Sequence, residues 1–133
     1  GDTYKITLNT REMKIDILPF IPYEMIWLVG DASPSGWDIG NATPMETTDD
    51  VNIFTWSGNL KAGELKFTLD KQSDWNGAWF LAGEPDKAPS GTEEAMIFHY
   101  PGAGPDYKWR ISEAGNYTIR LDQLNETITI AKQ

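Results

Sequence analysis

The amino-acid sequence predicts an all-β domain, an antiparallel β-sandwich, from three observations. Short segments alternate apolar and polar side chains, which is typical of strands with one buried face. Clusters of Gly, Pro, Asn, Asp and Ser separate these segments, as they do in turns between strands. Nowhere do apolar residues recur at helical spacing over two or more turns. Short strands joined by such turns favour a sandwich.

Length and charge limit the possible classes of function. The chain has 133 residues, enough for one domain with a substantial core. Its formal net charge of −9 argues against nucleic acid and anionic membranes as partners, because both require a basic surface. The chain contains no cysteine, which excludes disulfides, thiolate metal sites and cysteine nucleophiles. No apolar run has transmembrane length, so we expect no direct membrane insertion by this segment.

The first two candidate strands are expected to pair as a hairpin. Tyr4 to Leu8 and Lys14 to Ile17 alternate apolar and polar residues, and residues 9–13 connect them. Leu18 to Pro22 then carries two prolines, which impose extended backbone that cannot join the interior of a sheet. We therefore interpret Leu18 to Pro22 as a linker or as a crossing between sheets.

The central stretch of the chain, Ile26 to Asp38, combines a strand with a loop. Its first half, Ile26 to Val29, has no polar interruption, which is typical of a strand buried on both faces. Its second half consists of turn-forming residues and holds Trp37 at the tip of the loop. Exposure of a large ring to water brings no structural benefit. Trp37 is therefore expected either to contact a ligand or to fold back as a lid on the core.

Further strands are predicted at Ile53–Trp56, Leu65–Leu69, Ala95–Tyr100, Lys108–Ile111, Tyr117–Leu121 and Thr127–Ile130. Within Leu65–Leu69 the alternation places Lys66 and Thr68 on the outward face. The last two segments form a hairpin with very regular alternation. Residues 41–52 are a polar span without a predicted strand.

The six tryptophans fall into two groups by their surroundings. Three lie in apolar, strand-like segments and are expected in the core: Trp27, Trp56 and Trp109. Three lie in polar, turn-rich segments, and at least two of these are expected to be exposed: Trp37, Trp75 and Trp79. Between Trp75 and Trp79 stands Asn76-Gly77, a strong signal for a tight turn.

The first and last hairpins share a pattern. Five identical pairs are separated by 113 positions: Tyr4 and Tyr117, Ile6 and Ile119, Leu8 and Leu121, Ile15 and Ile128, Ile17 and Ile130. Either two hairpins with alternating isoleucines look alike by chance, or the chain comes from a tandem array of modules of about 110 residues. In the second case residues 1–18 close a preceding module and residues 22–133 form a complete one. The hairpin would then contribute little to the core of residues 22–133.

Several stretches spread over Met25 to Ile130 carry a resemblance to one family: Trp27–Ala32, Gly36–Trp37, Phe54–Leu60, Gly63–Phe67, Trp109–Ile111 and Gly115–Ile119. They resemble a module of SusE/SusF-type proteins. These are surface lipoproteins of Gram-negative gut bacteria that hold starch through tandem immunoglobulin-like carbohydrate-binding domains. The resemblance covers nearly a whole domain and agrees with the repeat.

The resemblance implies an immunoglobulin-like sandwich that binds a polysaccharide or oligosaccharide, with a starch-like α-glucan as the best guess. It implies a place on the cell surface, at the outer membrane, through a lipid anchor on an upstream segment. Other outer-membrane glycan-uptake proteins are the implied partners. Sites in this family join an aromatic pair to basic and amide side chains. Here that implicates Trp37 with Trp75 or Trp79, and Lys71 nearby.

The chemistry of sugars supports the same residues. A pyranose ring has apolar C–H faces and a rim of hydroxyl groups, so it requires a flat aromatic surface bordered by amide, carboxylate or cationic groups. Stacking on an aromatic face stabilises nucleobases by ~1–3 kcal/mol, and we assume no more for a sugar. The candidate ligand-binding residues are therefore Trp37, Lys71, Trp75, Asn76 and Trp79, with Tyr107 as a weaker candidate.

Two other classes of function compete with glycan binding. A glycosidase needs two carboxyl groups about 5–10 Å apart, yet no acidic residue stands in an apolar segment that would raise its pKa. His99 follows Ile97-Phe98 and is interpreted as structural, and hydrolase and zinc motifs are missing. We therefore expect no enzyme activity, no cofactor and no metal site with a recognisable ligand spacing; calcium on the loop carboxylates of Asp70 and Asp74 stays an open alternative. The third class is a structural spacer or protein-interaction module, whose loop tryptophans would be tucked into the core.

Overall fold

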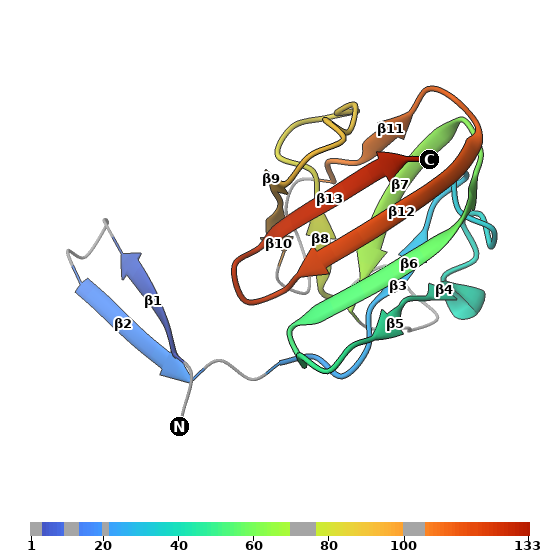
Figure 1. The fold of residues 1–133 in the computed structure, drawn as a ribbon. Helices are drawn as coiled ribbons and strands as arrows, with labels where there is room; N and C mark the ends of the chain where they lie inside the picture. The colour runs from blue at the N-terminus through green and yellow to red at the C-terminus, as the bar shows by residue number, and fades with distance from the viewer. Residues whose placement is uncertain (1–3, 10–13, 20–21, 70–76, 100–105) are drawn as a thin grey trace.

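Two antiparallel sheets pack face to face and form the β-sandwich that the sequence predicts (Figure 1). This computed structural model describes the backbone of residues 4–9 and 14–19 and, with side chains, residues 22–69, 77–99 and 106–133. No helix in these ranges is long and apolar enough to cross a membrane.

The six-stranded sheet contains the strands around the candidate site. Its order is β10-β8-β7-β3-β4, and β11 pairs with the first half of β7. Its members are β3 (Trp27–Val29), β4 (Thr43–Pro44), β7 (Gly63–Thr68), β8 (Trp79–Leu81), β10 (Ile97–His99) and β11 (Trp109–Ile111). A short helical turn, η1 (Ile39–Asn41), lies between β3 and β4.

The five-stranded sheet has the order β5-β6-β12-β13-β9 and lies in front in Figure 1. Its members are β5 (Glu46–Thr47), β6 (Ile53–Leu60), β9 (Glu94–Ala95), β12 (Gly115–Asp122) and β13 (Thr127–Lys132). Near the start of β12 the Tyr117 hydroxyl donates to the carbonyl of Glu113 at 2.6 Å. This tyrosine corner is a feature of immunoglobulin-like sandwiches.

The chain changes sheet at two buried methionines. The predicted single strand Ala95–Tyr100 is wrong in its described part, because β9 and β10 belong to different sheets. Met96 stands between them, and its N–H donates to the carbonyl of Glu126 at 2.9 Å. Met45 makes the same crossing between β4 and β5, inside the polar span. An unbranched Met side chain adapts to the irregular space at such crossings.

Alternation along the six-stranded sheet divides its apolar side chains between two clusters. Leu28, Phe67 and Phe80 belong to the main core between the sheets. The opposite face carries the outer cluster: Val29, Ile39, Ala42, Trp79 and Leu81, with Trp27 and Tyr107 packed against them. Loop residues thus cover the outward face of this sheet, and the prediction that β3 is buried on both faces is confirmed. Trp56 and Trp109 are buried in the main core as predicted.

The first hairpin forms a sheet of its own, β1 (Tyr4–Asn9) paired with β2 (Lys14–Pro19). Its pairs, from Tyr4 opposite Pro19 to Asn9 opposite Lys14, recur in β12–β13 at the same separation of 113 residues. The two hairpins therefore share their register as well as their sequence pattern. The division into residues 1–18 and 22–133 stays a prediction.

Glu94 fastens the loop that precedes β9 to the core. Its Oε1 accepts hydrogen bonds from Lys87 Nζ at 3.0 Å and Trp109 Nε1 at 3.2 Å. Its Oε2 accepts from the N–H and the hydroxyl of Ser90 at 2.8 and 2.6 Å. Burial works to raise the pKa of Glu94, but these donors outweigh it, and the pKa lies below the ordinary value of 4.5.

Replacement of Glu94 with Gln is expected to lower the free energy of unfolding by about 1–3 kcal/mol at neutral pH, because an amide cannot accept from all four donors. A lowered carboxyl pKa contributes stability that is complete above about pH 4.5 and is lost as the pH falls through the folded-state value. Urea unfolding of the unmodified protein and of Glu94→Gln, at pH 7 and at pH 3, measures the free energy of unfolding of each. The difference in free energy of unfolding between the two proteins should be smaller at pH 3 than at pH 7. An equal difference at both pH values would contradict the role of ionised Glu94.

Candidate functional site

The loop after β3 is closed by its own hydrogen bonds between Gly30 and Gly36, and Trp37 directly follows the closing residue. The Gly30 N–H donates to the carbonyl of Gly36 at 2.9 Å, and the Ser33 N–H donates back to the carbonyl of Gly30 at 2.9 Å. The Ser33 hydroxyl also donates to the Gly30 carbonyl, at 2.8 Å. Since the loop is held at both ends of the turn, the exposed Trp37 side chain starts from a fixed backbone position.

The same loop is anchored to the connection between β6 and β7. The Asp31 carboxylate accepts from the N–H of Glu64 at 2.6 Å. The Ala32 N–H donates to the carbonyl of Glu64 at 3.1 Å, and the Lys61 N–H donates to the carbonyl of Ala32 at 2.9 Å. These contacts join residues some 30 positions apart and explain why a loop rich in turn residues has a defined place on the sheet.

Lys66 extends from β7 on the outward face, as the sequence predicts, but its side chain is buried there. Its exposed fraction is 6%. Its Nζ lies 3.9 Å from the centroid of the Trp79 ring and 5.9 Å from that of Trp37. The ammonium also donates to Asp106 Oδ1 at 2.7 Å. Both ring distances fall within the range of cation–π attraction.

Asp106 joins two lysines beside Trp37. Its other carboxylate oxygen, Oδ2, lies 3.0 Å from Lys108 Nζ. Lys108 Nζ in turn lies 5.9 Å from the centroid of the Trp37 ring. The carbonyl of Tyr107 accepts from the N–H of Ala82 at 3.4 Å, which ties this segment to the end of β8. We call Trp37, Lys66, Asp106 and Lys108 the Trp37 cluster.

Burial and charge shift the ionisation of two members of the Trp37 cluster. Burial lowers the pKa of Lys66, although its contact with Asp106 opposes the shift. Burial works to raise the pKa of Asp106, but hydrogen bonds from Lys66 and Lys108 bring the pKa below its usual value. The Trp37 cluster thus combines two lysine side chains and one carboxylate, hydrogen-bond donors and acceptors, around an aromatic ring.

The structure separates the predicted site residues. Trp37 is 37% exposed, so it does not lie under the surface as a lid. Lys71, Trp75 and Asn76 lie outside the described residues. Trp79 is buried, with 3% of its surface exposed. The prediction that its ring is exposed and stacks on a sugar is therefore wrong. Its place in β8, opposite Thr68, puts the ring on the outward face of the sheet, where the outer cluster and Lys66 cover it.

Three members of the Trp37 cluster were missed by sequence reasoning: Lys66, Asp106 and Lys108. Alternation places Lys66 outward, yet nothing in its own strand indicates that an aromatic ring stands on each side of it. Lys66 and Asp106 are 40 positions apart, and only the packing of the 106–108 segment against β8 brings them together. The available signal is local: Asp106 and Lys108 flank Tyr107, which was noted as a weak candidate.

The remaining acidic side chains and His99 lie outside the Trp37 cluster. The described residues contain no group of three or more His, Asp or Glu side chains that could hold a metal ion; Asp70 and Asp74 lie outside the described residues. A hydrogen bond with Asp86, followed by burial, raises the pKa of Glu64. Two carboxyl groups in direct contact are too close to flank a glycosidic bond, which requires about 5 Å or more between them. His99 is half-buried, and neither ring nitrogen has a hydrogen-bond partner.

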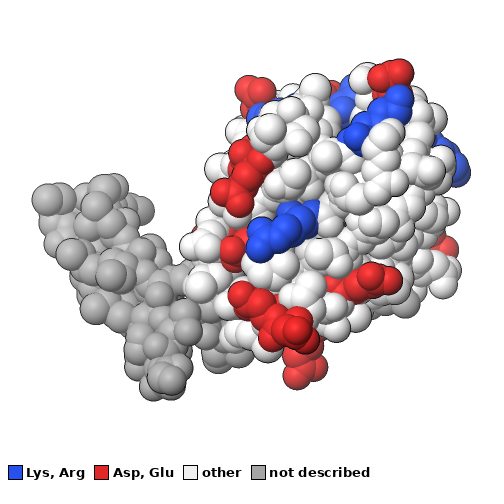
Figure 2. All heavy atoms as spheres, viewed as in Figure 1, with Lys and Arg blue, Asp and Glu red and all other residues white. Residues whose placement is uncertain are grey.

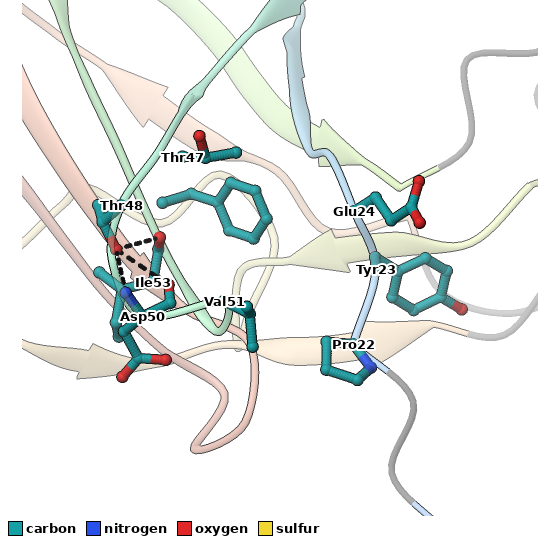
Figure 3. A pocket seen from close by; sticks show the side chains of 9 residues that line it. Pro22, Tyr23, Glu24, Thr47, Thr48, Asp50, Val51 and Ile53 are labelled. Carbon is teal, nitrogen blue, oxygen red and sulfur yellow. Dashed lines mark hydrogen bonds between the residues drawn. The ribbon is translucent and has the colours of Figure 1, made fainter.

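A pocket of about 340 Å³ lies where the chain enters the sandwich (Figure 3). Its walls are Pro22, Tyr23, Glu24, Thr47, Thr48, Asp50, Val51, Ile53 and Phe54. The side-chain amide of Gln123 anchors the backbone of Tyr23 beside this pocket. It accepts from the Tyr23 N–H at 2.9 Å and donates to the Tyr23 carbonyl at 3.0 Å. In Figure 3 the Tyr23 ring points away from Val51. Tyr23 and Phe54 are the aromatic residues of the pocket wall, and the Phe54 side chain is buried.

Charge on the visible face is mixed. Figure 2 shows Lys and Arg scattered among Asp and Glu, without a continuous basic patch on that side. Among known proteins, the chain matches no family model, and no curated protein is found to be similar to it.

Proposed function

We propose that this chain is a non-catalytic carbohydrate-binding module that holds a glycan by stacking on Trp37. The observation that carries the proposal is the exposed ring of Trp37, which directly follows a closed loop and is bordered by Lys108 and its partner Asp106. A sugar needs an aromatic face for its C–H groups and charged or amide groups for its hydroxyls. The Trp37 cluster supplies both within one small surface.

The identity of the glycan and the setting of the module rest on the family resemblance. We propose a starch-like α-glucan as ligand, in a bacterial cell-surface polysaccharide-utilisation system of the SusE/SusF type. An upstream lipid anchor would place the module at the outer membrane, beside other glycan-uptake proteins. The tyrosine corner of Tyr117 supports the immunoglobulin-like part of this resemblance.

Affinity electrophoresis against starch, glycogen, dextran, pectin and plant β-glucans tests the proposal. With one exposed ring and few polar contacts, we expect a Kd of about 10⁻⁴–10⁻³ M for the glycan that retards the protein. Replacement of Trp37 with Ala should abolish the retardation but lower the free energy of unfolding by less than ~1 kcal/mol, because the ring is partly exposed.

Val51→Ala is the matched control for this substitution. Val51 is also an exposed apolar side chain, at 67%, but it lies at the entry pocket and away from the Trp37 cluster. The control should be retarded like the unmodified protein. If Trp37→Ala binds as tightly as Val51→Ala, the site is misplaced.

A structural spacer or protein-interaction module is the second candidate. The apolar entry pocket beside the exposed Val51 favours it, because such a surface at the start of a domain suits contact with a neighbouring domain. Failure of every tested glycan to retard the protein would support this candidate over glycan binding.

A further inference from the structure

Lys66 is too deeply buried to act as a ligand contact, yet it is charged and lies at the centre of the Trp37 cluster. Only 6% of its surface is exposed. Burying an ammonium group is costly unless it is compensated. The compensation here comes from the Asp106 carboxylate at 2.7 Å and the Trp79 ring at 3.9 Å. The chain thus places a buried, compensated cation 5.9 Å from the centroid of the exposed Trp37 ring.

The contacts of the Trp37 cluster close into a ring. Lys66 binds one oxygen of Asp106 and Lys108 binds the other, at 2.7 and 3.0 Å. Both lysine ammonium groups then lie 5.9 Å from the centroid of the Trp37 ring. Each member thus interacts with two others, through two ion pairs and two contacts at the outer range of cation–π attraction, so the buried member is linked to the exposed ones.

We propose that Lys66 is a positioning residue for the glycan site. Its ammonium, seated on Trp79, holds Asp106 and through it Lys108, and together they keep the Trp37 ring in the orientation that a sugar stacks on. This inference rests on the proposed function for its glycan readout. Its structural part, the control of Trp37 by Lys66, can be measured without any glycan.

Alkaline pH separates positioning from simple stabilisation. Burial lowers the pKa of Lys66, opposed by Asp106 and Glu64 and assisted by Lys108, so the group loses its charge below its ordinary 10.5. A lysine whose pKa is lowered by folding contributes stability that rises with pH between the folded and unfolded values. Glycan affinity should fall over the same interval, because uncharged Lys66 no longer holds Asp106. Stability and binding therefore respond to this residue in opposite directions.

Three variants test the proposal. Lys66→Met removes the charge but keeps the length, and Lys66→Arg keeps the charge at all accessible pH values. Lys132→Met is the matched control, since Lys132 pairs with Glu113 at 3.3 Å on the surface. The first readout is iodide quenching of Trp37 fluorescence, taken as the difference between each protein and its Trp37→Phe counterpart. The second is affinity electrophoresis, from pH 7 to pH 10.5, against the glycan that retards the unmodified protein.

Lys66→Met is expected to change the quenching of Trp37 and to lose about tenfold in affinity, the usual size of coupling between contacting residues. Lys66→Arg should restore both readouts in part and remove the alkaline fall in affinity. Lys132→Met should resemble the unmodified protein. Quenching and affinity unchanged in Lys66→Met, or changed equally in Lys132→Met, would overturn the proposal.

Asp106→Asn keeps the test decisive if Lys66→Met fails to fold. Asp106 has a side chain that is 56% exposed, so its replacement is expected to leave the fold intact. Loss of its charge breaks the link between the two lysines and should change Trp37 quenching as Lys66→Met would; unchanged quenching would overturn the proposal. If no glycan retards the unmodified protein, the proposed function fails, while quenching still decides whether Lys66 positions Trp37.

Discussion

Replacement of Trp79 with Ala is expected to lower the free energy of unfolding by ~3–5 kcal/mol, the usual cost of removing a large buried ring. Trp79 is 3% exposed and forms part of the outer cluster with Val29 and Leu81. Its loss would also remove the ring on which the Lys66 ammonium rests. The change therefore combines a cavity with a buried cation that has lost one of its stabilising contacts.

Urea unfolding of Trp79→Ala and Trp37→Ala compares the two tryptophans directly. The midpoint should fall strongly for Trp79→Ala and little for Trp37→Ala, with the slope unchanged in both because the native fold is kept. Glycan binding should be lost in both variants. In Trp79→Ala the Trp37 cluster is distorted, and in Trp37→Ala the stacking ring is missing. A cost below ~1 kcal/mol for Trp79→Ala would mean that its ring is exposed in solution.

The strands of this fold could be predicted from the sequence wherever alternation runs over five residues or more. In the segments around Leu65, Tyr117 and Thr127 every second residue is apolar. This alternation is sufficient to predict that they are strands. The two-residue strands β4, β5 and β9 are too short to show an alternation of apolar and polar residues. They exist because the chain crosses between sheets at Met45 and Met96, which is a property of the packed sandwich.

The candidate site was predictable only at Trp37, where a large ring among turn residues stands out in the sequence. The burial of Trp79 was not predictable from its polar neighbours, because it depends on a layer of loop residues, including Ile39 and Tyr107, that covers the outward face of the sheet. The ion pairs of Asp106 have the same origin. They connect β7 to a segment 40 positions later in the chain, and the local sequence does not indicate such a contact.

The Trp37 loop also depends on one glycine, and replacement of Gly30 with Ala is expected to destabilise the domain by about 3 kcal/mol or more. Gly30 has a φ of +129°, a conformation that side-chain-bearing residues rarely adopt. A Cβ at this position would overlap the carbonyl oxygen of Glu64. Because that oxygen belongs to the backbone of β7, neither partner can move without breaking the contacts that anchor the loop.

Gly83→Ala is the matched control for Gly30→Ala, since a Cβ at Gly83 would meet nothing within 4 Å. It should change the free energy of unfolding by no more than about 0.5 kcal/mol. In Gly30→Ala the loss of stability should be accompanied by altered iodide quenching of Trp37 and weaker glycan retardation, because the loop that carries the ring is displaced. Equal stability of the two variants would mean that Gly30 and Glu64 do not approach closely in solution. The Trp37 loop would then lack the anchor on which the orientation of the platform depends.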